Sequence, residues 1–317
     1  MKETYRQFCE NESTLPIFSR DWWLDTVAGP EGWDVVTVEK GGEITAALPY
    51  SLTNKFGLTV LGQPPLTQCL GPWLKESKAK YAKQLGQQKD LMISLVENLP
   101  QYSHFSQKWH FSQTNWLPFH WQGFEQSTRY TYRLENLGDE QELWSNLQEN
   151  IRREIKKARD RLGIFVRDDL GIKEFLELNK LVFSRQGRKL PYTEALVERI
   201  DRACEERMCR KIFIAEDKEG RLHAGVYIIW DDNSAYYLMG GGDPELRNSG
   251  ATSLCMWEAI RFAGNHVNSF DFEGSMIEPI ERFFRAFGAV QTPYSSIKKT
   301  PSRFLQSLFF LQKLKGG

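Results

Sequence analysis

The order of strand and helix signals in the second half of the chain restricts the fold most strongly. Three runs rich in β-branched and aromatic residues follow one another with only short turns between them, which predicts antiparallel hairpins. A glycine-rich segment then separates the third run from an apolar helical pattern. Strands joined partly by hairpins and partly by helices form a mixed, mostly antiparallel sheet flanked by helices, an α/β (α+β) architecture. The predicted elements are a helix over 139–162, a strand at 164–167, helices near 171–183 and 193–207, strands at 211–216, 221–230 and 234–239, a helix over 252–264, a strand at 269–272, a helix over 279–287, a strand at 289–297 and a last helix from about 302.

The first half of the chain has a shorter version of the same order. A short helix through Trp22–Val27 precedes two β-rich runs, Trp33–Glu39 and Ile44–Leu52, which a turn with two glycines joins into a hairpin. A Pro-rich irregular stretch and a polar helical segment over 75–99 follow. The repeated order predicts an internal duplication with a boundary near residues 125–130.

Length and composition exclude several classes of protein. The 317 residues suit two domains of ordinary size, and 41 basic against 41 acidic residues leave no net charge. Zero net charge argues against whole-surface binding to DNA or to an anionic membrane, although local basic patches can still bind. The polar start predicts no secretory signal, and no run approaches the ~18 apolar residues of a membrane span.

Cysteines and histidines give no sign of a metal site. Five cysteines at irregular spacing predict reduced thiols and a cytoplasmic location rather than a disulfide framework. No histidine pair has a metal-binding spacing, so no metal is predicted. The chain also lacks a G-x-x-x-x-G-K-[ST] phosphate loop and a G-x-S-x-G nucleophile elbow. P-loop enzymes, zinc hydrolases and α/β-hydrolases are therefore not expected.

The glycine-rich segment 240–252 is the strongest candidate for a ligand site. Small residues between a strand and a helix let backbone N–H groups approach a ligand, and the start of the helix attracts negative charge. Arg247 adds a fork-shaped partner for a phosphate. The alternative is an ordinary strand-to-helix turn that contains glycines.

A basic run forms a second candidate. At helical spacing, Arg152 and Lys156 stack, as do Arg153 and Lys157, beside an apolar stripe. The run could cradle the phosphates of a nucleotide-linked acceptor or a tRNA, or it could be a solvated helix face. Arg185 and Arg188 lie in a loop that could cover an acceptor.

Two acids are candidates for proton transfer or amine binding. Asp271 and Glu273 alternate with Phe270 and Phe272, so the pattern predicts that both acids share one face of a strand. In the functional interpretation, the two acids line a cleft between strands. In the alternative interpretation, they only mark the point where the chain leaves the end of the strand.

The basic, apolar tail over residues 298–317 could contact a membrane surface. Packing of its helix onto the second domain is the favoured interpretation.

The segment Arg247-x-x-Gly250-x-Thr252 resembles the pyrophosphate loop of the GNAT N-acyltransferase superfamily. The family has Gly or Ala where this chain has Thr252, which could crowd a pyrophosphate or donate a hydroxyl. The wider resemblance is to the FemAB-like branch, with two tandem GNAT-like domains, and is carried by Ser19–Trp23, Gly41–Pro49, Asn150–Ala158, Gly240–Trp257, Phe270–Ser275 and Arg282–Ala289.

This resemblance implies that the two domains have different roles. Residues 1–127 would be a degenerate GNAT-like domain on the acceptor side, and residues 128–317 the catalytic, donor-binding domain. The donor would be acetyl-CoA or another acyl-CoA, with aminoacyl-tRNA as the alternative, and Tyr237 would lie near the leaving thiolate. The donor-binding residues implied are Met239, Gly240, Arg247, Asn248, Ser249, Gly250, Ala251 and Thr252.

The implied reaction is direct attack of an amine on the activated carbonyl. Such a reaction needs positioning, carbonyl polarisation and a base, with Asp271 and Glu273 as candidates for the base. The acceptor would be a cell-envelope precursor or a nucleotide-linked molecule. Two alternatives stay open: a Fem-type transferase that uses aminoacyl-tRNA on a peptidoglycan precursor, and a catalytically silent binding module with the same fold.

Overall fold

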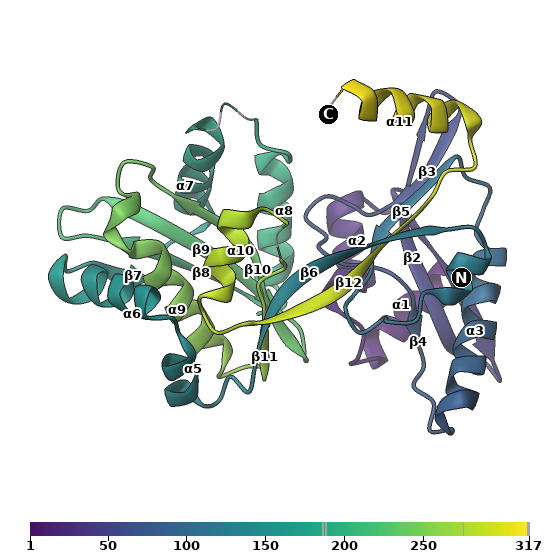
Figure 1. Ribbon diagram of the computed structural model, residues 1–317, viewed down its shortest axis with the longest axis horizontal. Coiled ribbons are helices and arrows are strands. Elements are labelled where there is room, and N and C mark those ends of the chain that lie inside the picture. Colours follow the sequence, from purple (N-terminus) through teal and green to yellow (C-terminus); the bar gives the residue numbers. More distant parts are fainter. Residues whose placement is uncertain (186, 188, 275, 316–317) are drawn as a thin grey trace. The chain divides into compact units, whose positions relative to one another are not determined.

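The computed structural model describes the whole chain except Gln186, Arg188, Ser275, Gly316 and Gly317. The chain forms two compact units (Figure 1). The first contains Met1–Arg129 together with Pro293–Gly317, and the second contains Tyr130–Thr292. The C-terminal tail therefore lies in the first unit, whereas the sequence analysis assigned it to the second domain.

The sheet of the second unit has the strand order β6-β11-β10-β9-β8-β7. Within it β10 and β11 run parallel, and the pairs β11–β6, β10–β9, β9–β8 and β8–β7 are antiparallel, which confirms the predicted mixed, mostly antiparallel sheet. The strands are β6 (Glu125–Glu135), β7 (Phe165–Arg167), β8 (Arg210–Glu216), β9 (Leu222–Trp230), β10 (Ser234–Gly242) and β11 (Ser269–Asp271). The helices are α5 (Glu140–Asn146), α6 (Glu149–Lys156), the π-helical turn η2 (Lys157–Arg161), α7 (Ile172–Arg185), α8 (Glu194–Glu205), the 3-10 turn η3 (Arg247–Ser249), α9 (Ala251–Ala263) and α10 (Glu278–Arg285).

Helices cover both faces of this sheet. Ala224 and Val226 of β9 belong to a buried core that includes the apolar side of α9. A side chain at Gly225, between them, would instead meet the ring of Phe175 in α7. Because neighbouring strand residues point to opposite faces, α9 and α7 pack on opposite sides of the sheet.

The sheet of the first unit has the order β1-β2-β3-β5-β12, and β4 pairs with β2. Here β3 and β5 are the parallel pair. The strands are β1 (Trp33–Lys40), β2 (Glu43–Lys55), β3 (Leu58–Gly62), β4 (Trp73–Leu74), β5 (His104–Lys108) and β12 (Val290–Lys299). The helices are α1 (Lys2–Asn11), the 3-10 turn η1 (Ile17–Ser19), α2 (Asp21–Ala28), α3 (Tyr81–Glu97), α4 (Leu117–Trp121) and α11 (Arg303–Lys315).

The two units share one topology. In each, two antiparallel hairpin connections lead to a loop, a helix and a parallel strand, and a further antiparallel strand pairs with that parallel strand. These last strands are exchanged in sequence, because β6 follows the first unit but pairs with β11, whereas β12 follows the second unit but pairs with β5.

Two predicted elements differ from the structure. The helix predicted over 139–162 is broken into α5, α6 and η2, because the Gln148 N–H donates to the Ala286 carbonyl at 2.9 Å between α5 and α6. The terminal helix was expected to pack on the second domain, but α11 follows β12 in the first unit. No helix in the described part of the chain has both the length and the apolar character of a bilayer span.

Candidate active site

A cavity of about 300 Å³ opens in the second unit where β9, β10 and the start of α9 meet. Five residues predicted from the sequence line it: Tyr237, Gly240, Arg247, Ser249 and Thr252. The other predicted donor residues do not line it: Met239 and Ala251 are buried, Gly250 caps α9, and Asn248 is exposed. The glycine-rich segment thus forms a cavity wall, with the first turn of a 13-residue helix beside it.

Two glycines at the end of β10 are required by close packing. A Cβ at Gly240 would lie 1.9 Å from the Tyr237 hydroxyl, and one at Gly241 would lie 2.6 Å from the backbone nitrogen of Asn179 in α7. Asn179 also donates from Nδ2 to the Gly240 carbonyl at 2.7 Å, and the Tyr192 hydroxyl donates to Asn179 at 3.0 Å. These contacts fix the strand end that forms the cavity wall.

Gly250, the residue before α9, packs against α6. Its φ of +84° is in the left-handed region, and a Cβ there would lie 2.4 Å from the Glu154 carbonyl oxygen. Glu154 accepts a hydrogen bond from the Ser253 hydroxyl, and the Lys157 ammonium donates to the Asn248 carbonyl at 2.6 Å. The basic segment of α6 and η2 therefore packs directly against the start of α9.

The predicted acceptor residues have different surroundings. Arg152 donates to the carbonyls of Trp144 and Ser145, at 3.4 and 2.9 Å, and so caps the end of α5. Arg153 and Lys156 are exposed. α7 ends at Arg185, and Arg188 lies outside the described residues. Arg152, Arg153 and Lys156 do not line the cavity.

The strands β10 and β11 separate beside this cavity. Their parallel pairing runs from Ser234 with Ser269 to Tyr236 with Asp271 and stops there, while β10 continues to Gly242. The register of β10 against β9 also shifts between Tyr237 and Met239, as at a β-bulge. Past Tyr236, β10 therefore loses its ladder with β11.

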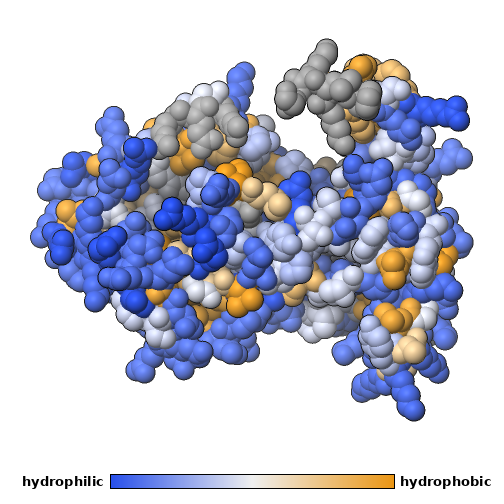
Figure 2. Space-filling view, viewed as in Figure 1, coloured by the Kyte–Doolittle hydropathy of each residue, from blue (hydrophilic) through white to orange (hydrophobic). Residues whose placement is uncertain are grey.

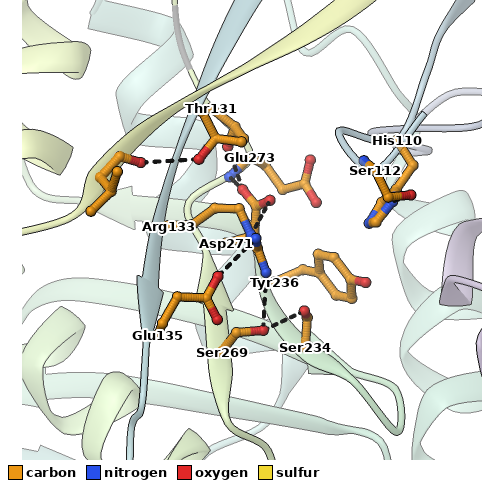
Figure 3. Close-up of polar contacts among 12 residues, drawn as sticks. His110, Ser112, Thr131, Arg133, Glu135, Ser234, Tyr236, Ser269, Asp271 and Glu273 are labelled. Carbon is orange, nitrogen blue, oxygen red and sulfur yellow. Dashed lines mark hydrogen bonds and ion pairs between the residues drawn. The ribbon is translucent and has the colours of Figure 1, made fainter. Parts of the chain in front are cut away.

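Asp271 stands at the point where the two strands separate. Its carboxylate accepts hydrogen bonds from the Thr131 hydroxyl and from the Glu273 N–H at 2.7 Å, and Arg133 Nε lies 3.6 Å away (Figure 3). Arg133 also contacts Ser269 at 3.2 Å. Burial raises the pKa of Asp271 to about 6, although the hydrogen bonds and Arg133 oppose this rise. A carboxyl group with such a pKa can accept a proton near neutral pH.

Glu273 does not share a strand face with Asp271, so this prediction is wrong. β11 ends at Asp271, because the Asp271 side chain accepts the backbone N–H two residues later and turns the chain. Glu273 has a φ of +58°, and Gly274 after it has +61°. A Cβ at Gly274 would lie 2.2 Å from the Tyr130 carbonyl oxygen, so this turn packs tightly on β6.

Tyr237 lies half-buried in the cavity wall, and its ring packs edge-on against Phe284 with 5.8 Å between centroids. Burial raises the pKa of its phenol well above the usual value. The hydroxyl therefore keeps its proton at neutral pH and can donate it in a hydrogen bond.

Sequence reasoning missed a buried pair at the start of β9. His223 lines the cavity, and its Nε2 lies 2.9 Å from an Asp217 carboxylate oxygen. Burial alone would raise the pKa of Asp217. Hydrogen bonds from His223 and Arg221 outweigh this effect and hold the pKa well below its usual value. A lone histidine in the sequence carries no spacing signal, so only the hairpin β8–β9 reveals the pair. No group of three or more His, Cys, Asp or Glu side chains in the described chain is arranged to hold a metal.

Comparisons with known proteins agree with this architecture. Residues 145–279 match the family model of a GNAT acetyltransferase domain. The structure of FemX has a TM-score of 0.70 at 14% identity, with 97% of this chain and 98% of that chain covered. The C-terminal domain of a putative lysylphosphatidylglycerol synthetase from Agrobacterium fabrum has a TM-score of 0.59 at 11% identity, with coverages of 97% and 94%.

A conserved protein of unknown function from Bacteroides thetaiotaomicron is also similar, with a TM-score of 0.57 at 9% identity and coverages of 87% and 88%. No curated protein matches the sequence. At these identities the solved structures show a common fold. The cavity lies in the segment that matches the family model, since all of its lining residues fall within residues 182–252. Residues 145–279 thus match the model of a GNAT acetyltransferase domain, and the chain as a whole shares its fold with FemX.

Proposed function

We propose that the protein is an N-acyltransferase that moves an acyl group, acetyl from acetyl-CoA, to an amine of a cell-envelope or nucleotide-linked acceptor in the cytoplasm. The observation that carries this proposal is the cavity at the start of α9, with Arg247 and Thr252 in its lining. Arg247 is exposed and makes no ion pair with any residue that the structure describes. A free guanidinium beside the N–H groups of a helix start suits the diphosphate of an acyl-CoA.

The thioester would extend from this cavity along the part of β10 that follows Tyr236, where β11 no longer pairs with it. There the acceptor nitrogen attacks the thioester carbonyl carbon, the C–N bond forms and the C–S bond breaks. Asp271 takes the proton that the amine loses, and Tyr237 supplies a proton to the leaving thiolate. The pKa of Asp271, near 6, supports its role as proton acceptor, and the position of Tyr237 in the cavity wall supports its role as proton donor.

The residues proposed to bind the acceptor are chosen on their charge alone. Arg152, Arg153, Lys156, Arg185 and Arg188 would pair with acceptor phosphates. Arg153 and Lys156 are free to do so because they are exposed, whereas Arg152 would have to keep its contacts with α5.

Replacing Arg247 by Ala is expected to weaken acetyl-CoA binding at least about tenfold, or ~1.4 kcal/mol, because a charge-assisted contact to phosphate is lost. Calorimetric titration of the purified protein with acetyl-CoA and with CoA measures this. The matched control is Arg202→Ala, since Arg202 is an exposed arginine of α8 away from the cavity. Absence of binding to the unaltered protein up to roughly 1 mM, weaker than about −4 kcal/mol, would contradict the acyl-CoA donor.

A second candidate is transfer from aminoacyl-tRNA to a peptidoglycan precursor. The fold likeness to FemX and to a domain named for lysylphosphatidylglycerol synthesis supports it. Failure to bind acetyl-CoA, together with binding of charged tRNA, is the result that favours this candidate. Binding of acetyl-CoA without thiol release in the presence of any amine, tested on glucosamine, amino-sugar nucleotides and peptide amines, is the result that favours a silent binding module.

A further inference from the structure

The terminal helix α11 has an apolar face that the protein does not cover. Phe304, Leu308 and Leu311 follow one another at i, i+4 and i+7, so they form one stripe along the helix. Their exposed fractions are 66%, 40% and 53%. Orange side chains are visible on α11 at the upper right of Figure 2. Three large exposed side chains on one stripe mark an interaction surface rather than a scatter of single apolar residues.

A different face of α11 fixes the helix to the first unit. Leu305 is buried, and the ring of Phe309 packs edge-on against His104 with 5.2 Å between centroids. His104 also contacts the Thr300 hydroxyl at 2.9 Å, and Gln306 donates to the Thr300 carbonyl at 2.7 Å. The stripe is therefore exposed while Leu305 and Phe309 hold the helix on the first unit.

Charge indicates what the stripe binds. Residues 298–317 contain five basic residues and no acid. Lys298 pairs with Glu125 at 3.0 Å, and Lys299 donates to the Gln122 carbonyl at 2.6 Å. Arg303, at the start of the helix, is exposed and has no ion pair within the described part of the chain. A second copy of this chain would bring the same positive charge to the contact, so self-association through α11 is disfavoured.

We propose that α11 is a docking element for an anionic lipid surface, with its apolar stripe in the headgroup region and Arg303 against the lipid phosphates. An apolar stripe with cations beside it is the combination that holds a helix in the plane of a membrane interface. This proposal does not depend on the acyl donor, because no residue of α11 lines the cavity of the second unit.

Vesicle flotation of the full chain tests the proposal. The unaltered protein is expected to float with vesicles of phosphatidylglycerol and phosphatidylcholine, and more weakly with phosphatidylcholine alone. Phe304→Gln with Leu308→Gln should lower the bound fraction on anionic vesicles at least about tenfold, and Arg303→Glu should lower it and reduce its salt dependence. Ser307→Gln, a polar change at an exposed site on the same helix, should float like the unaltered protein.

Each other outcome has a definite meaning. The proposal fails if the unaltered protein does not float with anionic vesicles, if both vesicle types bind it equally, or if the double variant floats as well as the unaltered protein. It also fails if sedimentation shows a dimer that the double variant loses, since a second copy would then be the occupant. Unchanged thermal unfolding and acetyl-CoA binding of the variants show that the change is confined to the helix surface.

Discussion

Replacing Asp271 by Asn is expected to lower the rate of acyl transfer by about 10²- to 10⁴-fold, the usual contribution of a positioned general base. Asn keeps the shape of the side chain and an oxygen for the Glu273 N–H, which donates to Asp271 at 2.7 Å. It cannot take a proton from an amine. The measurement is thiol release from acetyl-CoA in the presence of the best acceptor amine.

The pH dependence of the rate provides a second readout. Burial raises the pKa of Asp271 to about 6, so the fraction of ionised carboxylate, and with it the rate, should rise as the pH passes through about 6. In Asp271→Asn this limb should disappear. A rate of the variant within threefold of the unaltered enzyme, with the limb retained, would show that another group accepts the proton.

Asp271→Asn should also change the stability of the protein, in the direction opposite to its effect on the rate. The folded pKa of about 6 lies above the ~3.9 of an unfolded aspartate, so between about pH 4 and 6 the folded chain binds more protons than the unfolded chain. The free energy of unfolding therefore falls as the pH rises through this window and stays lower above it. Asp271→Asn should remove this decline, which urea denaturation at pH 4.5 and 7.5 can measure.

Two matched variants separate chemistry from local charge. Glu135→Gln removes an exposed acid that pairs with Arg133 at 2.8 Å, and Glu273→Gln removes the other acid of the turn. Glu135→Gln should leave the rate nearly unchanged. If Glu273→Gln causes the larger loss, the proton acceptor is Glu273 and not Asp271.

Much of the fold could be predicted from the sequence because the patterns that indicate its strands, helices and turns are local. Hairpin turns, the apolar runs of β8 to β10 and the glycine-rich segment before α9 each depend on neighbouring residues, and the structure has these elements within a few residues of the predicted ranges. The same is true of the cavity wall, since the predicted Arg247 and Thr252 do line it.

The parts that the sequence did not reveal depend on contacts between distant residues. The break between α5 and α6 needs the Ala286 carbonyl, and the end of β11 at Asp271 is set by a side chain that turns the backbone. The buried pair of His223 and Asp217 exists only because the β8–β9 hairpin brings the two residues together. Periodicity cannot encode such pairs, because each partner alone resembles an ordinary surface or strand residue.

Gly250→Ala is expected to destabilise the second unit by about 2–5 kcal/mol, since two costs add. The first is the left-handed backbone, with φ at +84°, which costs an L-residue about 1–2 kcal/mol. The second is the new Cβ, which would lie 2.4 Å from the Glu154 carbonyl oxygen and force α6 away from α9, at about 1–3 kcal/mol. Urea denaturation followed by far-UV circular dichroism measures the loss.

Gly86→Ala supplies the matched control with the opposite sign. Gly86 lies inside α3 of the first unit, and a Cβ there would meet nothing within 4 Å. Alanine in a helix interior stabilises by about 0.8–1 kcal/mol relative to glycine, so this variant should be more stable than the unaltered protein. If both variants shift stability in the same direction, the close contact of α6 with the start of α9 is not what Gly250 permits.

The same pair of variants connects packing to function. Lys157 and Glu154 attach the basic helical segment to the glycine-rich segment and to the start of α9, through the Asn248 carbonyl at 2.6 Å and the Ser253 hydroxyl. If α6 moves away from α9, the N–H groups at the start of α9 lose the position in which they could meet a diphosphate. Gly250→Ala should therefore also weaken acetyl-CoA binding by at least tenfold under conditions where the variant is still folded, whereas Gly86→Ala should leave binding unchanged. Normal affinity in a folded but destabilised Gly250→Ala variant would mean that the donor does not contact the start of α9.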